Sequence, residues 1–201
     1  MRIGIIGIGS LTMELAFRSV RAGYKVKIHN PRGNSLVRDV FEKMGSNIQL
    51  SSMEQASDTE IVILFVPKED LQQVILSMPD MSGKLIVHTS SLIFNPKLLL
   101  SGITNSMTYK TTASMLPEAH IVKLFNPVNL KRNTLINHNK DDKKIFFTGD
   151  HKDSRNCLRA FLKNIHFSPI DISGRLHLHN NGMNSKTGAA ANFAAKAKGS
   201  F

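Results

Sequence analysis

The 201-residue sequence contains one cysteine, no tryptophan and only 2 tyrosines. Cys157 has no second thiol to pair with, so a disulfide-stapled secreted fold is excluded and a reducing compartment is expected. No apolar run approaches the about 20 residues of a membrane-spanning helix, and the N-terminus shows no signal-peptide pattern. We therefore expect a cytoplasmic protein without a membrane partner.

Acidic residues are also scarce, with 15 Asp and Glu against 26 Lys and Arg and a formal net charge of +11. A basic surface attracts anions of many kinds, including nucleic acids, phosphorylated cofactors and acidic partners. The basic residues are spread along the chain, and few aromatic residues accompany them, whereas base-stacking surfaces need aromatics. The pattern disfavours nucleic-acid binding and suits a phosphorylated cofactor.

The first residues of the chain carry the clearest motif. An apolar run over residues 3–8 contains Gly7, Gly9 follows, and residues 10–22 repeat apolar side chains at helical spacing. A strand, a glycine turn and a helix in this order open a mononucleotide-binding unit. Gly7 permits the tight turn, and Gly9 lets the backbone approach a pyrophosphate at the positive end of the helix. A turn that binds no ligand is the alternative interpretation.

The start of this helix adds three candidate residues. Ser10 is expected to cap the helix and to donate to a phosphate, and the pyrophosphate is expected over Gly7, Gly9, Ser10 and Leu11. Thr12 completes the candidate cofactor-binding set at the helix start. It stands where the motif usually has Gly or Ala for close helix–strand packing, so local looseness is expected there.

The end of the second strand, at residues 24–29, indicates which nucleotide is bound. NAD-binding units usually place an acid here to bond the ribose, but this sequence reads His-Asn-Pro-Arg-Gly-Asn over residues 29–34. Arg32 is suited to a 2′-phosphate, and Asn30 could bond that phosphate or the ribose. NADP is therefore favoured over NAD. A solvated turn arginine is the alternative for Arg32.

The remaining pattern predicts an α/β domain of the doubly wound, Rossmann-like kind, with a mostly parallel sheet and helices on both faces. It covers residues 1–172, and a basic tail rich in Gly, Asn and Ala, with a weak helix near its end, covers 173–201. Further strands are expected at 47–50, 61–66, 84–88, 120–125, 144–148 and 167–171, and helices at 35–44 (with Val40 facing inward), 68–77, 111–116 and 153–163, whereas 92–107 is less regular.

Five short motifs follow one another in a familiar order. They are Gly-Ile-Gly-Ser at 7–10, Asn-Pro-Arg-Gly at 30–33, Leu-Phe-Val-Pro at 64–67, Val-Lys-Leu-Phe-Asn at 122–126 and Phe-Phe-Thr-Gly-Asp at 146–150. Together they resemble the NADP oxidoreductase family that includes the NADPH-dependent reductases of the deazaflavin coenzyme F-420. Ferric-reductase-like cytoplasmic domains of some membrane proteins look similar too. The resemblance extends over about residues 1–172.

The resemblance implies roles for particular residues. It implies that Asn30 and Arg32 hold the 2′-phosphate, that Val66 and Pro67 pass beside the cofactor, and that Phe125 and Asn126 line its nicotinamide end. The chain departs from the family after the fifth strand, where residues 88–91 read His-Thr-Ser-Ser instead of an Asp followed by Asn-Pro.

Few residues suggest acid–base, nucleophilic or metal chemistry. His88 is the one weak catalytic candidate: it could bond an acceptor carbonyl or handle a proton, or it could be a strand-end histidine with a backbone partner. Cys157 is expected to pack in a helix beside Leu158 and Phe161. His177 and His179 alone make a poor metal site, so no metal is expected.

Three functions remain open. The first is an NADP-dependent oxidoreductase that transfers a hydride between NADPH and a flavin-like, deazaflavin or other small electron acceptor. The second is a reductase of another small-molecule class, such as imines or hydroxy acids, which would need a partner to supply the missing helical domain. The third is a non-catalytic NADP-binding or interaction module. A homodimer is a further expectation, because small domains of this kind often need a partner to close the acceptor site.

Overall fold

The computed structural model describes residues 1–89, 102–126 and 143–174. Its elements are β1 (Arg2–Ile6), α1 (Ser10–Arg21), β2 (Lys25–His29), the 3-10 helix η1 (Asn34–Val37), α2 (Arg38–Glu42), β3 (Ile48–Leu50), α3 (Met53–Ser57), β4 (Ile61–Leu64), α4 (Leu71–Leu76), β5 (Leu85–His88), α5 (Gly102–Met115), β6 (His120–Leu124), β7 (Lys143–Gly149), α6 (Lys152–Asn164) and β8 (Phe167–Asp171).

The strands of the described residues form one sheet in the order β3-β2-β1-β4-β5-β6-β7-β8. Every neighbouring pair is parallel except β6 and β7, which run antiparallel. The chain begins at β1, builds outward to β3, then returns to β4 and builds toward β8. The strand order thus reverses between β1 and β4, which is the crevice where open α/β sheets bind ligands. The predicted doubly wound, mostly parallel α/β fold is confirmed.

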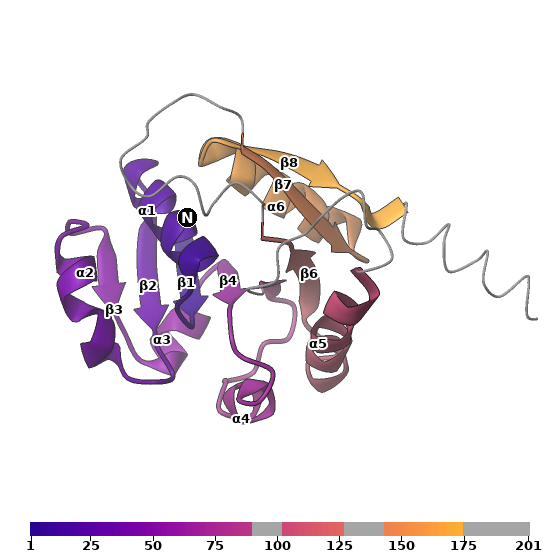
Figure 1. The fold of residues 1–201 in the computed structure, drawn as a ribbon, viewed down its shortest axis with the longest axis horizontal. Coiled ribbons are helices and arrows are strands. Elements are labelled where there is room, and N and C mark those ends of the chain that lie inside the picture. The colour runs from indigo at the N-terminus through magenta and orange to yellow at the C-terminus, as the bar shows by residue number, and fades with distance from the viewer. Residues whose placement is uncertain (90–101, 127–142, 175–201) are drawn as a thin grey trace, which may run out of the picture.

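Helices cover both faces of this sheet. On one face, α1 and α6 bury Leu11, Leu15, Leu158 and Phe161 against strand residues such as Ile5. The other face is covered by α3, α4 and α5, in a separate apolar cluster. Figure 1 shows α1 and α6 on the upper side of the drawing and α3, α4 and α5 on the lower side. Both faces of the central strands are therefore buried, which explains their continuous apolar sequences.

Three details of the sequence prediction are wrong. Helix α5 begins at Gly102, inside the stretch predicted to be less regular. Its sequence mixes Gly, Asn, Ser and Thr, which are poor helix formers, without an apolar stripe, so neither propensity nor periodicity marks it. Val40 is 46% exposed instead of facing inward, because α2 is short and Phe41 takes the core position. Cys157 is exposed on α6 instead of packed in the core.

Among the described residues, no helix combines the length and the apolar character needed to cross a bilayer. The predictions for Ser90, Ser91, the two tail histidines and residues 175–201 lie outside the described residues.

Candidate cofactor site at the carboxyl edge of the sheet

The predicted site residues gather at one edge of the sheet. Because β1, β2, β4, β5 and β6 are parallel, their carboxyl ends lie side by side. The loops that leave these ends carry, in spatial order, Asn30 and Arg32, then Gly7 and Gly9, then Val66 and Pro67, then His88 with Thr89, and finally Phe125 and Asn126. The structure therefore brings together residues that lie more than a hundred positions apart in sequence.

The glycine turn after β1 is required by packing. Gly7 has a φ of +89°, and a side chain there would collide with the backbone carbonyl of Phe65 at the end of β4. Its N–H donates to the carbonyl of His29 at 2.9 Å. A Cβ on Gly9 would lie 2.6 Å from the Phe65 ring. Both glycines thus let β1 and β4 end close together, and the same absence of side chains leaves the backbone open to a pyrophosphate.

The start of α1 differs from the prediction in its capping. Gly9, not Ser10, is the N-cap, and Ser10 is the first helical residue, with an exposed side chain. Thr12 is buried, and its hydroxyl accepts from the Gly9 N–H at 2.8 Å and donates to the Gly9 carbonyl at 3.1 Å. This residue therefore ties down the turn instead of loosening it. The N–H groups of Ser10 and Leu11 belong to the first turn, where no intrahelical acceptor exists.

In the turn after β2, the side chains of Asn30 and Arg32 have different positions. Asn30 is buried: its Nδ2 donates to the carbonyl of Gly33 at 2.8 Å and its Oδ1 accepts from the Arg32 N–H at 3.3 Å. The Asn30 backbone N–H donates to Asn34 Oδ1 at 2.8 Å. The side chain of Asn30 thus builds the turn, whereas the Arg32 side chain extends from it and is 67% exposed. Of the two side chains, that of Arg32 is the one accessible from solvent.

Sequence reasoning missed the partner of Arg32. An Arg32 guanidinium nitrogen lies 2.9 Å from a carboxylate oxygen of Asp70, the residue just before α4. The two residues lie 38 positions apart, so only the fold joins them. The β2 end lacks an acid in its own sequence, yet the loop after β4 brings one to it.

Val66, Pro67 and Phe125 have less exposed places at the edge. Val66 and Phe125 are buried, the first in the cluster below α4 and the second against Ile172. Pro67 is half-buried at the start of the loop that leads to Asp70. Val66 and Phe125 therefore expose little side-chain surface at this edge.

His88 ends β5 in a buried position. It is 1% exposed, and its Nδ1 lies 3.1 Å from the hydroxyl of Thr112 on α5. Burial, with a smaller contribution from the charge of nearby Lys123, lowers the pKa of His88 to about 3. The imidazole is therefore neutral at physiological pH. Its partner is a side-chain hydroxyl, not the backbone group that the alternative interpretation named.

Lys123, near the carboxyl end of β6, was not among the candidate residues identified from the sequence. It sits opposite His88 in the β5–β6 register and is 1% exposed. Its Nζ has no hydrogen-bond partner within the described ranges and lies 6.0 Å from the centre of the Phe125 ring. Burial lowers the pKa of Lys123 to about 8. The nearby Asn126 side chain is buried as well, so this end of the edge holds several polar groups away from water.

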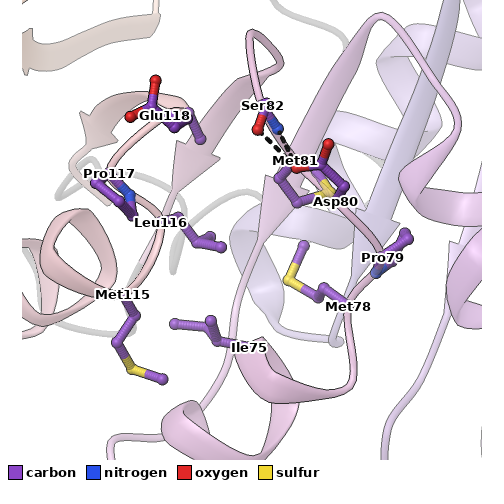
Figure 2. Close-up of a pocket in the computed structure, with 11 residues that line it drawn as sticks. Ile75, Met78, Pro79, Asp80, Met81, Ser82, Met115, Leu116, Pro117 and Glu118 are labelled. Atoms are coloured by element: carbon purple, nitrogen blue, oxygen red, sulfur yellow. Dashed lines mark hydrogen bonds between the residues drawn. The ribbon is translucent and has the colours of Figure 1, made fainter.

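A surface cavity of about 250 Å³ lies at the opposite, amino edge of the sheet. Figure 2 shows its lining, which comes from the end of α4, the segment before β5 and the segment that joins α5 to β6. Asp80 is held there by the backbone N–H and the hydroxyl of Ser82. The cavity is therefore separate from the residues considered above. Within the described part of the chain, no three His, Cys, Asp or Glu side chains converge as a metal site would require.

Residues 2–91 match the family model described as NADP oxidoreductase, coenzyme F420-dependent. The family resemblance is confirmed over these residues. The match includes the glycine turn, the β2 turn, the end of β4 and His88, and it stops short of the predicted extent of 1–172. The resemblance of the segments 122–126 and 146–150 stays a prediction.

The chain also resembles parts of longer proteins. It is 35% identical over 65 residues to a probable mitochondrial 3-hydroxyisobutyrate dehydrogenase of Arabidopsis thaliana, a match of 32% of this chain and 18% of that protein. It is 23% identical over 176 residues to the metalloreductase STEAP3 of Rattus norvegicus, covering 85% of this chain and 33% of that protein. The chain therefore spans a third or less of the length of these relatives.

Solved structures share the fold at low identity. A hypothetical protein of Sinorhizobium meliloti is 21% identical with a TM-score of 0.69, covering 86% of this chain and 85% of that one. An imine reductase of Myxococcus stipitatus, solved in complex with NAD+, is 13% identical with a TM-score of 0.61, covering 98% and 64%. At these identities the likeness establishes the Rossmann-type fold.

Proposed function

We propose that this protein is an NADP(H)-dependent oxidoreductase that transfers a hydride between NADPH and a flavin-like, deazaflavin or other small electron acceptor. The observation that carries the proposal is the joining of the Gly7–Gly9 turn, the open start of α1 and the exposed Arg32 on adjacent loops of one sheet edge. The family match over residues 2–91 supports the same cofactor class.

The residues present fit a dinucleotide. The first N–H groups of α1 and the Ser10 hydroxyl would hold the pyrophosphate, helped by the positive end of the helix dipole. Arg32 would bind the 2′-phosphate with a planar, charged fork. Phe125 and Asn126, after β6, would border the nicotinamide. When bound, NADPH supplies the hydride, which needs orientation and exclusion of water more than acid–base help.

The acceptor end contributes a neutral imidazole. Since burial keeps His88 uncharged, it can offer a hydrogen bond to a bound ring but not a proton at neutral pH. Its Nδ1 contact with Thr112 fixes the ring against α5. His88 would therefore orient the acceptor ring. We further propose that the protein is cytoplasmic and that a second copy of the chain closes the acceptor end of the site in a homodimer.

The first test is a fluorescence titration of the protein with NADPH and with NADH at fixed ionic strength. We expect NADPH to bind at least about tenfold more tightly, equal to about 1.4 kcal/mol. Arg32→Gln should weaken NADPH about 30-fold, because a charged hydrogen bond contributes about 2 kcal/mol, and should leave NADH unchanged. Arg38→Gln, an exposed arginine at the start of α2, is the matched control.

The second test is an anaerobic acceptor screen that follows NADPH oxidation with riboflavin, FMN, a deazaflavin and a ferric chelate. Turnover with one of these supports the oxidoreductase. Tight NADPH binding without turnover would favour the non-catalytic binding module, and binding of neither nucleotide would refute the cofactor assignment.

A further inference from the structure

The loop that joins β4 to α4 reaches the turn after β2, at residues 30–34, which carries Arg32. In the sheet, β2 and β4 flank β1, so the loops at their carboxyl ends face each other across the Gly7–Gly9 turn. In folds of this kind the adenosine part of a dinucleotide lies in this gap. The Arg32–Asp70 ion pair spans it, with 2.9 Å between nitrogen and oxygen.

The backbone on the arginine side of the gap is fixed. Asn30 bonds both Gly33 and the Arg32 N–H, and Asn34 bonds the Asn30 N–H and the carbonyl of Ser51 at 3.0 Å. The Arg32 side chain beyond this turn makes one polar contact with the described residues, the contact with Asp70. The contact with Asp70 therefore sets the position of the Arg32 guanidinium in the protein without a bound nucleotide.

Asp70 is free to play this part. Its side chain makes no capping bond to α4, although it occupies the N-cap position, and it is 42% exposed. Its backbone N–H donates to the carbonyl of Pro67 at 3.2 Å, which holds the loop without using the carboxylate. The carboxylate is thus committed to Arg32 and not to folding.

We propose that Asp70 is a specificity-determining residue that occupies Arg32 in the free protein and so limits the preference for NADPH over NADH. This inference rests on the proposed function. A 2′-phosphate must take the guanidinium from one carboxylate oxygen and then lie near a second negative charge, whereas NADH, with a hydroxyl at that position, meets neither obstacle. Asp70 thereby acts as an internal competitor for the phosphate.

The test is Asp70→Asn, titrated with NADPH and with NADH as for the wild type. Asn keeps the shape and the N-cap preference, so folding should not change. We expect NADPH to bind about fivefold more tightly, because the variant removes both the Arg32–Asp70 ion pair and the repulsion between Asp70 and the 2′-phosphate. The affinity for NADH should change less than about twofold. Glu69→Gln is the matched control, because Glu69 is an exposed neighbouring acid and its substitution removes the same charge.

A double variant separates the route of the effect. In an Arg32→Gln background, Asp70→Asn should improve NADPH binding by only about twofold, from the remaining like-charge repulsion, because the competition for Arg32 no longer exists. Unchanged or weaker NADPH binding by Asp70→Asn alone overturns the inference, as does an equal gain from Glu69→Gln. If the wild type binds NADPH tightly, such results leave the proposed function standing. If it binds neither nucleotide, both proposals fail.

Discussion

At the β2 end of the candidate site, Arg32 and Asp70 meet in solvent, whereas at the β5–β6 end His88 and Lys123 lie buried beneath α5. The exposed pair is screened by salt and contributes little to folding. The buried groups have pKa values displaced by burial, and their charge states are tied to the stability of the fold. The same sheet edge therefore has an exposed arginine that can exchange ion-pair partners and buried polar groups whose protonation states affect the stability of the fold.

The largest effect should come from acid at the buried end. The pKa of His88 is about 3 in the fold against an ordinary 6.5, so only the unfolded chain takes up this proton as the pH falls through 6.5. Stability should fall by about 2 kcal/mol between pH 7 and pH 5 from this group, and by about 3 kcal/mol at pH 4. Urea unfolding of the wild type and of His88→Gln at each pH measures the difference. Parallel pH profiles would show that His88 does not titrate as its burial requires.

Lys123 should give a pH dependence of the same sign as His88, but in a higher pH range. Its pKa is about 8 in the fold against an ordinary 10.5, so the buried ammonium destabilises the protein at neutral pH and the penalty is relieved as the pH rises from 8 to 10.5. Lys123→Met should raise the free energy of unfolding at pH 7 by about 2 kcal/mol and remove that rise. The control is Lys110→Met, at an exposed position on α5. A destabilised Lys123→Met protein would mean that the ammonium has an acceptor beyond the described residues.

The glycine turn lies between the two ends and should respond modestly. Thr12→Ala removes the hydroxyl that accepts from the Gly9 N–H, which should cost about 1 kcal/mol of stability by thermal or urea unfolding. The residue that replaces Thr12 is one that this motif commonly has, so the fold should persist. A stability loss below about 0.3 kcal/mol would show that water replaces the hydroxyl bond without penalty.

Salt should produce the smallest effect and the sharpest contrast. Raising the ionic strength from about 0.05 to about 0.5 M should weaken NADPH binding about fivefold and NADH binding less than about twofold, because only the first uses exposed Arg32. The difference in pH dependence between the wild type and His88→Gln should not move with salt. Equal salt dependence for both nucleotides would remove the assigned role of Arg32.

The sequence was sufficient to predict the sheet, whereas the roles of the candidate site residues stay predictions. Continuous apolar strands, glycine turns and amphipathic helices are local signals, and they identified the β1–α1 unit and the eight strands of the described residues. Helix α5, which packs against β6 and α4, was missed over its first half because its residues carry no apolar period.

The parts of the site that the sequence missed depend on long-range contacts. Asp70 follows β4 and looks like any loop acid until the sheet order places it beside Arg32. Lys123 looks like a solvent-facing residue of a strand, and its burial follows from α5 covering that face of the sheet. Asn30 was expected to contact the nucleotide, but in the turn the Asn30 side chain forms hydrogen bonds with Gly33 and Arg32. The prediction that it also meets the phosphate has not been tested.

The contact between Gly7 and the Phe65 carbonyl has a consequence for tracing descent in this lineage. If the proposed function holds, a descendant that no longer bound NADPH would still need glycine at this position to fold, so the motif would persist after the activity was lost. Arg32, which the fold does not need, would be free to drift. On that proposal, the residue at position 32, and not the glycine turn, is expected to change first once NADPH binding is lost.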